Sequence, residues 1–259
     1  MMDAYTHLDM SVQYPMDALD ACMKDAGIDR ALVVETWSGD NRACLDQLIA
    51  SPLPQFRVAL CFRPTDERSG PAIFAENSVG GIRVRTADLK AFRPLAAALE
   101  SSQKWLIPHA EAGIGKLTSE LLDLIRDFPQ LRIFLPHMGW PRRDGQNEED
   151  WYESVSRLGA LPTVVAGVSA IAHFSHTPFP HEDVKPYAIR LREVFGPGSL
   201  FAASDYPLFE TGKYADYMNL ATEWIGPDIA GAGVLESALF QGSQLARRQM
   251  SRGIDTKLD

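Results

Sequence analysis

Residues 104–137, KWLIPHAEAGIGKLTSELLDLIRDFPQLRIFLPH, contain two short apolar runs separated by a segment with a different periodicity. The runs at 104–109 and 131–137 have the length and the branched and aromatic residues of β-strands. Between them, apolar residues recur every three or four positions until Pro129. This stretch therefore predicts a strand, a covering helix and a second, parallel strand.

The same alternation extends through the chain. Apolar strands are predicted at 3–8, 30–36, 56–62, 80–85, 104–109, 131–137, 163–169 and 199–205. A helical pattern follows each strand, although it is faintest around 66–77, and an extra C-terminal helix is predicted at about 234–250. Eight strand–helix units without a glycine-rich linker predict an α/β fold, a (β/α)8 TIM barrel that forms a single domain over residues 1–259.

The composition narrows the possible partners. Of the 259 residues, 46% are hydrophobic and 23% are charged, which is typical of a globular protein with a large core. The net charge of -9 comes without a basic run, so we expect no nucleic-acid partner. The three cysteines are widely spaced, and there is no leader-like or bilayer-length apolar run. We therefore expect a cytoplasmic protein with reduced thiols and no membrane partner, and a homo-oligomer is left open.

Polar residues stand at the predicted strand ends, on the side where a barrel of this type builds its active site. They are Tyr5, His7, Glu35, Trp37, Arg83, Arg85, His109, His137, Ser169 and Asp205. A single histidine at such a position is often a core imidazole held by a backbone carbonyl. Three histidines with an aspartate favour a site, because burying them is costly unless they serve one another or a metal. Imidazole and carboxylate are suitable ligands for zinc or manganese, with one position left for water.

Four segments at these strand ends resemble the amidohydrolase superfamily. They are DAYTHLD at 3–9, HAEAG at 109–113, PHMGWP at 136–141 and SDYP at 204–207, in the family's order. The closer match is the amidohydrolase-2 branch, which includes dicarboxypyrone and sugar-acid lactonases and aminocarboxymuconate-semialdehyde decarboxylase. The resemblance implies an eight-stranded barrel, a divalent metal held by His7, His109 and Asp205, and His137 beside the reacting group.

The first strand departs from that family, whose members usually carry a His-x-His pair there. In this chain Tyr5 occupies the first position and His7 the second. A phenol must lose a proton of pKa about 10 to bind a metal strongly, although a metal can force this loss. Three outcomes stay open: a metal site with Tyr5 as a weak or outer-shell ligand, a metal-free site, or a loss of catalysis. The resemblance to dicarboxypyrone lactonases implies that metal-free hydrolysis is feasible, with the strand-eight aspartate activating water.

Several residues are candidates for substrate binding. Arg83 and Arg85 lie two positions apart on one strand and face the same way, which suits a clamp for a carboxylate. The alternative is a pair of surface or packing arginines. We expect Trp37, Trp140 and Tyr206 to line or shield the pocket and Ser169 to donate a hydrogen bond to substrate. Glu35 is interpreted as a ligand, an acid or a helix cap.

The histidines of the loop after the seventh strand are a separate group. They are His173, His176 and His181. A proline-rich loop with these spacings more often presents side chains to solvent or substrate than builds a second metal cluster.

These residues together predict a hydrolase that opens a lactone, or another cyclic ester or amide, of a small carboxylated substrate. Asp205 is expected to act as general base, and His137, with His7 and His109 or their metal, to stabilise the oxyanion. One alternative is a metal-dependent decarboxylase of an aromatic or muconate-type acid. The other is a catalytically inactive barrel that serves as a binding protein.

Overall fold

The computed structural model describes residues 1–66, 69–142, 147–196, 198–208 and 213–226, together with residues 236, 239 and 240. Within these ranges no helix is both long enough and apolar enough to cross a bilayer. Cys22, Cys44 and Cys61 all lie in the described ranges, and none forms a disulfide.

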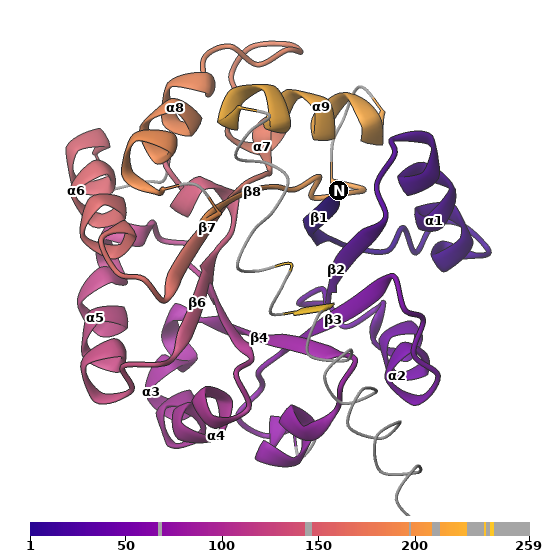
Figure 1. Ribbon diagram of the computed structural model, residues 1–259, viewed down its shortest axis with the longest axis horizontal. Helices are drawn as coiled ribbons and strands as arrows, with labels where there is room; N and C mark the ends of the chain where they lie inside the picture. Colours follow the sequence, from indigo (N-terminus) through magenta and orange to yellow (C-terminus); the bar gives the residue numbers. More distant parts are fainter. Residues whose placement is uncertain are drawn as a thin grey trace, which may run out of the picture.

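Eight parallel strands form one sheet in chain order, as predicted (Figure 1). They are β1 (Met2–Thr6), β2 (Arg30–Val34), β3 (Phe56–Cys61), β4 (Val79–Arg85), β5 (Trp105–His109), β6 (Arg132–Leu135), β7 (Val164–Val168) and β8 (Leu200–Ala202). Two backbone hydrogen bonds join the last strand region to the first. The N–H of His7 donates to Tyr206 O at 2.8 Å, and the N–H of Asp205 donates to Tyr5 O at 3.0 Å. The sheet therefore curls into a (β/α)8 barrel.

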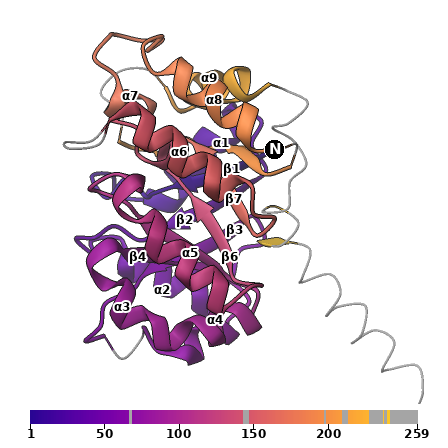
Figure 2. The ribbon, with the colours of Figure 1, turned by 90° about the vertical axis from the view of Figure 1, so that its left-hand side faces the viewer.

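Helical segments follow the strands and surround the barrel (Figures 1 and 2). The α-helices are α1 (Pro15–Asp25), α2 (Arg42–Ala50), α3 (Leu89–Phe92), α4 (Ala96–Ser101), α5 (Thr118–Asp127), α6 (Glu148–Gly159), α7 (Ile171–Phe174), α8 (Lys185–Val194) and α9 (Tyr214–Ile225). Short 3₁₀ turns are η2 (Pro71–Ala75), η3 (Thr86–Asp88), η4 (Arg93–Leu95), η5 (Ile114–Lys116) and η6 (His137–Gly139). The apolar periodicity predicted between the strands at 104–109 and 131–137 is confirmed in α5, because Leu121, Leu124 and Ile125 are buried.

The third crossover differs from the others. A covering helix was expected around 66–77, but the described part of this crossover contains only η2, a single 3₁₀ segment that Pro71 begins. Gly70 and Pro71 interrupt the segment, so too few residues remain for a full α-helix before β4 starts at Val79. The predicted C-terminal helix at 234–250 lies outside the described residues except for residues 236, 239 and 240.

Apolar side chains pack in two layers. The larger layer lies between the strands and the surrounding helices, and the smaller one fills the barrel interior. Leu239 and Phe240 belong to the interior layer. Arg57, near the start of β3, donates from Nε to Leu239 O at 2.9 Å, and its guanidinium lies 4.6 Å from the Phe240 ring centroid. These two residues therefore close the N-terminal end of the barrel, opposite the end where the strands finish.

A buried carboxylate reinforces the contact between β1 and the region after β8. Asp3 is fully buried, and its Oδ1 accepts the backbone N–H groups of Tyr5 at 3.2 Å and Ser204 at 3.0 Å. Its Oδ2 accepts the hydroxyls of Ser204 at 2.6 Å and of Tyr214, in α9, at 2.8 Å. Burial raises the pKa of Asp3 to about 6, and these hydrogen bonds oppose the rise. Asp3 therefore links the first strand, the last strand region and the last described helix.

We expect Asp3→Ala to destabilise the protein strongly, because it leaves two backbone N–H groups and two hydroxyls without their buried acceptor. Each unsatisfied buried donor costs about 1–3 kcal/mol, so the free energy of unfolding should fall by roughly 3 kcal/mol or more. Urea unfolding measures this loss. Asp29→Ala is the matched control, since the side chain of Asp29 is 77% exposed and pairs with the N-terminal amine. Equal effects of the two substitutions would contradict the role given to Asp3.

Candidate active site

A cavity of about 280 Å³ opens at the C-terminal ends of the strands. It is lined by His7, Arg83, His109, Glu111, His137, Trp140, Ala170, His173, Phe174, Asp205 and Leu208. These residues follow or end β1, β4, β5, β6, β7 and β8, so the parallel strands bring them together from distant parts of the chain.

Five of the side chains expected at the site line this cavity: His7, Arg83, His109, His137 and Asp205. Five others lie around it and are not part of its lining: Tyr5, Trp37, Arg85, Ser169 and Tyr206. Trp140 lines the cavity as expected, with its ring centroid 4.6 Å from that of His109 and 5.0 Å from that of His137.

The backbone at the ends of three neighbouring strands adopts an unusual conformation. His137, Ala170 and Asp205 have φ values of 56°, 54° and 58°. This left-handed region costs non-glycine residues about 1–2 kcal/mol each. Such a cost at three consecutive strand ends is tolerated because the turns aim His137 and Asp205 into the cavity.

His7 and Asp205 face each other across the cavity floor. The Nδ1–H of His7 donates to Val34 O at 2.7 Å, which leaves Nε2 as an acceptor 3.7 Å from Asp205 Oδ1. Burial and, to a smaller extent, the charge of Arg83 together lower the pKa of His7 to about 3. The imidazole is therefore neutral, and its free lone pair points toward the carboxyl group.

Asp205 is 5% exposed, and its Oδ1 has no hydrogen-bond partner among the described residues. Burial raises its pKa to about 8; Arg83 opposes this rise and Asp3 adds to it. Its conjugate base therefore becomes fully populated only as the pH rises through about 8. A carboxyl group with this pKa can accept a proton in the neutral to mildly alkaline range.

The imidazole of His137 is held by Ser169. The backbone N–H of His137 donates to Ser169 Oγ at 3.1 Å, and Ser169 Oγ lies 2.9 Å from His137 Nδ1. With the serine hydroxyl donating to Nδ1, the imidazole proton resides on Nε2. Burial lowers the pKa of His137 well below its ordinary value, so the ring is a neutral donor. Ser169 thus orients His137, whereas it was expected to contact substrate.

Arg83 is a buried cation with neutral partners. The residue is 6% exposed, and within the described part of the chain its guanidinium forms no ion pair with a carboxylate. Its Nη2 donates to His109 Nδ1 at 2.9 Å and its Nη1 to Glu35 O at 3.3 Å, while its Nε is buried without a partner. Buried charges normally have a counter-ion, so this one is suited to receive an anionic group of a ligand.

Arg85 is the last residue of β4, two positions after Arg83, and it is exposed. Both guanidiniums contact the same Trp37 ring, with Cζ 4.3 Å from the centroid for Arg85 and 5.0 Å for Arg83. The expected common orientation of the two arginines is therefore found, but only Arg83 reaches the cavity.

Tyr5 lies beneath the cavity residues. It is fully buried, with its ring centroid 4.5 Å from that of His137 and 5.3 Å from that of His7. Its hydroxyl has no hydrogen-bond partner in the described ranges, and burial raises the pKa of the phenol well above its ordinary value. The side chain is therefore a neutral hydroxyl at the position where the family places a metal-binding histidine.

The residues implied as metal ligands do not fit a divalent ion in this arrangement. Among the described residues, no three His, Cys, Asp or Glu side chains lie close enough together to hold an ion. His109 Nδ1 receives the guanidinium of Arg83, and its Nε2 lies 3.4 Å from Glu111 Oε2. Both nitrogens of this implied ligand therefore face other partners, and the adjacent cation disfavours a second positive charge.

The loop histidines were expected to face solvent or substrate, and the structure contradicts this expectation for His181. His173 lines the cavity, whereas His181 is buried between Thr177 O and the Tyr217 hydroxyl, at 2.9 and 3.1 Å. The backbone N–H of His176 donates to Asp183 Oδ2 at 2.9 Å in the same loop.

Sequence reasoning missed four lining residues: Glu111, Ala170, Phe174 and Leu208. Glu111 and Leu208 lie two and three residues beyond the strand-end residues His109 and Asp205, so proximity in sequence was an available signal. Ala170 and Phe174 carry no chemical signature that distinguishes them from core residues.

Comparison with curated proteins gives a partial match to a lactonase. A segment of 101 residues is 32% identical to L-fucono-1,5-lactonase of Burkholderia ambifaria. The segment covers 38% of this chain and 34% of the lactonase, so the match spans about a third of that relative.

Solved structures share the fold over most of the chain. An amidohydrolase from Burkholderia multivorans with bound zinc superposes with a TM-score of 0.71 at 16% identity, covering 95% of this chain and 97% of the other. A probable 2-pyrone-4,6-dicarboxylic acid hydrolase from Acinetobacter baumannii with bound citric acid gives a TM-score of 0.73 at 14% identity, covering 93% and 98%.

A family model assigns the chain as a whole. The amidohydrolase model, of the amidohydrolase-2 type, matches residues 9–228. The match includes the segments at 109–113, 136–141 and 204–207 and confirms the resemblance to this family, whereas residues 3–8 precede it. The chain belongs to the amidohydrolase family of enzymes.

Proposed function

We propose that this protein is a hydrolase that opens the lactone ring of a small, carboxylated acid. The observation that carries the proposal is the buried guanidinium of Arg83, which has no carboxylate partner among the described residues, in one cavity with His137 and with Asp205, whose Oδ1 has no hydrogen-bond partner among them. The partial match to a lactonase supports it, as does the fold shared with a probable dicarboxylic acid hydrolase that binds citric acid.

Asp205 and His7 are placed to hold the attacking water. Asp205 Oδ1 and His7 Nε2 are both acceptors, 3.7 Å apart, and a water molecule can donate one hydrogen to each. Ionised Asp205 then takes a proton as the water oxygen attacks the lactone carbonyl. Because this carboxyl has a raised pKa, it is a stronger base than an exposed aspartate.

His137 is placed to stabilise the negative charge that develops on the carbonyl oxygen. Its Nε2–H can donate to that oxygen, and Ser169 holds the ring in the required tautomer. When the ring C–O bond breaks, the proton held by Asp205 passes to the leaving oxygen. Water has then been added, and a carboxylic acid and a hydroxyl group are formed.

Arg83 is the proposed receptor for the substrate's carboxylate. It is a cation in a largely desolvated position, where an anion gains more from pairing than it does in water. Arg85 stands at the outer edge of the Trp37 ring and would attract the anion before it enters. The preferred substrate is therefore a lactone that carries a carboxylate.

The two alternative functions receive less support. A metal-dependent decarboxylase requires a firmly held ion, and the arrangement around His109 does not fit one. A binding protein without catalytic activity would not require the raised pKa of Asp205 beside His7.

Asp205→Asn should abolish lactone hydrolysis. Loss of a general base typically lowers kcat by about 10²–10⁴-fold, and KM should change little because the amide has nearly the same shape. Steady-state kinetics on a panel of carboxylated lactones measures this. Glu111→Gln, which removes a carboxylate from the edge of the same cavity, is the matched control and should retain most of its activity. A parent-like rate for Asp205→Asn would exclude the mechanism.

Arg83→Lys should weaken recognition of the acid specifically. It keeps a positive charge but loses the planar guanidinium, so KM for a carboxylated lactone should rise roughly tenfold or more. The methyl ester of the same lactone should be hydrolysed almost as well as by the parent enzyme. Arg85→Lys, at the exposed position, should have the smaller effect. If acid and ester changed by the same factor, Arg83 would not be the carboxylate receptor.

Lactonase activity should persist after treatment with a chelator, because no step of the proposed mechanism uses an ion. Protein purified without chelator or added metal should contain far less than one equivalent of zinc or manganese by elemental mass spectrometry. A zinc hydrolase treated in parallel controls for the chelator. Stoichiometric metal with chelator-sensitive activity would show instead that His7, His109 and Asp205 rearrange to bind an ion.

A further inference from the structure

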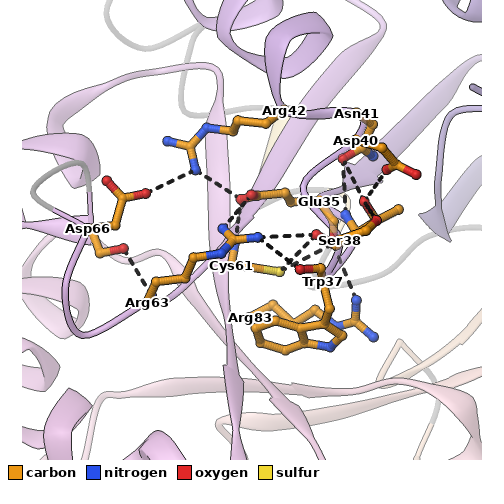
Figure 3. A network of polar contacts seen from close by, with 12 residues as sticks. Glu35, Trp37, Ser38, Asp40, Asn41, Arg42, Cys61, Arg63, Asp66 and Arg83 are labelled. Atoms are coloured by element: carbon orange, nitrogen blue, oxygen red, sulfur yellow. Dashed lines mark hydrogen bonds and ion pairs between the residues drawn. The ribbon is translucent and has the colours of Figure 1, made fainter.

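A second buried carboxylate, Glu35, lies directly behind the cavity wall. It follows β2, is fully buried and is not part of the cavity lining, so it has no place there as a ligand or an acid. Its Oε2 accepts the N–H of Cys61 at 2.7 Å and Nη1 of Arg42 at 3.1 Å. Its Oε1 accepts Nη1 of Arg63 at 2.5 Å (Figure 3). One carboxylate thus serves two arginines.

The two arginines then diverge. From Nη2, Arg63 donates to the carbonyl oxygens of Thr36 and Trp37, at 3.4 Å each. Arg42 instead directs its Nε to Asp46 Oδ1, at 2.9 Å, one turn along α2. Figure 3 shows Arg63 on the side of the carboxylate that faces the Trp37 loop, with Arg42 on the other side. Of the two arginines, Arg63 is therefore the one that connects the Glu35 carboxylate to the loop that carries Trp37.

The Trp37 ring is the surface against which the functional side chains lie. Both Arg83 and Arg85 contact it, and its centroid lies 5.3 Å from that of His109. Cations are attracted to the face of an indole ring, more strongly where water is excluded. A shift of this ring would therefore displace both guanidiniums.

The Glu35–Arg63 ion pair is only partly buried, because the Arg63 side chain is 30% exposed, and such a pair is a poor source of stability. It does fix geometry, because both oxygens of Glu35 and both terminal nitrogens of Arg63 are engaged in defined directions. We propose that Glu35 and Arg63 are positioning residues. They brace the 35–37 segment so that Trp37 holds Arg83 and Arg85 where a carboxylate binds. This inference rests on the proposed role of Arg83 as a carboxylate receptor.

The test compares Arg63→Met with Arg42→Met. Each variant removes one of the two arginines paired with Glu35, so both should lower the urea midpoint, and Arg42→Met should lower it at least as much because Arg42 also pairs with Asp46 and Asp66. Only Arg63→Met also releases the Thr36 and Trp37 carbonyls. It alone should weaken binding of pyridine-2,4-dicarboxylate, a planar diacid with no ester to hydrolyse, by roughly tenfold in isothermal titration calorimetry. If Arg63→Met does not fold, Arg63→Lys is used instead. It keeps the positive charge beside Glu35 but lacks the second terminal nitrogen, which donates to the Thr36 and Trp37 carbonyls.

A double-substitution cycle separates positioning from a general structural effect. In a Trp37→Ala background, Arg63→Met should cause no further loss of diacid affinity, because the element through which it acts is already gone. On a lactone that the parent hydrolyses, Arg63→Met should raise KM with little change in kcat. A purely structural role would lower affinity equally in both backgrounds.

The outcomes distinguish this inference from the proposed function. If the parent binds the diacid but hydrolyses no lactone, and Arg63→Met alone weakens binding, the function is wrong and the positioning role stands. If the parent is a lactonase and Arg63→Met binds as tightly as the parent, or no worse than Arg42→Met, the positioning role is wrong. A parent that does not bind the diacid would overturn the carboxylate receptor and the inference with it.

Discussion

The burial of Asp3 is the constraint on which the site depends. Its carboxylate gathers hydrogen bonds from Tyr5, Ser204 and Tyr214 and so fixes the meeting of the first strand with the last. The two backbone hydrogen bonds at this meeting involve His7 and Asp205, the residues that face each other across the cavity floor. The geometry of the reacting groups is therefore set by the closure of the barrel. Asp3 also acts through its charge, since it contributes to the raised pKa of Asp205.

Charge in the cavity is distributed unevenly. Burial neutralises the imidazoles of His7 and His137 and raises the pKa of Asp205, while Arg83 stays positive. The same guanidinium helps to lower the pKa of both imidazoles, so it reinforces their neutral state. The result is a cavity with two neutral imidazoles beside the cation Arg83, and with the carboxylate of Glu111 at its edge. This arrangement favours an anionic ligand, and Asp205 reaches the ionised form that a general base requires as the pH rises through about 8.

The sequence allowed the barrel and the five central residues to be predicted because both follow from simple geometry. Strand periodicity located all eight strands, and parallel strands necessarily end on one side. The alternation of side chains along a strand placed Arg83 and Arg85 on the same face. It carried no information about how deeply each arginine is buried, and of the two only Arg83 lines the cavity. Ser169 was assigned to substrate because the pattern could not show that the next strand's histidine would lie against it. The partners of Glu35 come from two separate segments, the start of α2 and the end of β3, so no local pattern could reveal them.

Leu239 and Phe240 give the barrel an unusual order of completion. They come after β8 in the chain, yet they pack among interior side chains of strands from β1 onward and contact Arg57 in β3. During synthesis the first strands leave the ribosome long before these two residues. The N-terminal end of the barrel is therefore open at first. Water is fully excluded from the barrel interior after Leu239 and Phe240 have been synthesised and have packed there. The strand ends that line the cavity are therefore synthesised before the two residues that close the N-terminal end of the barrel.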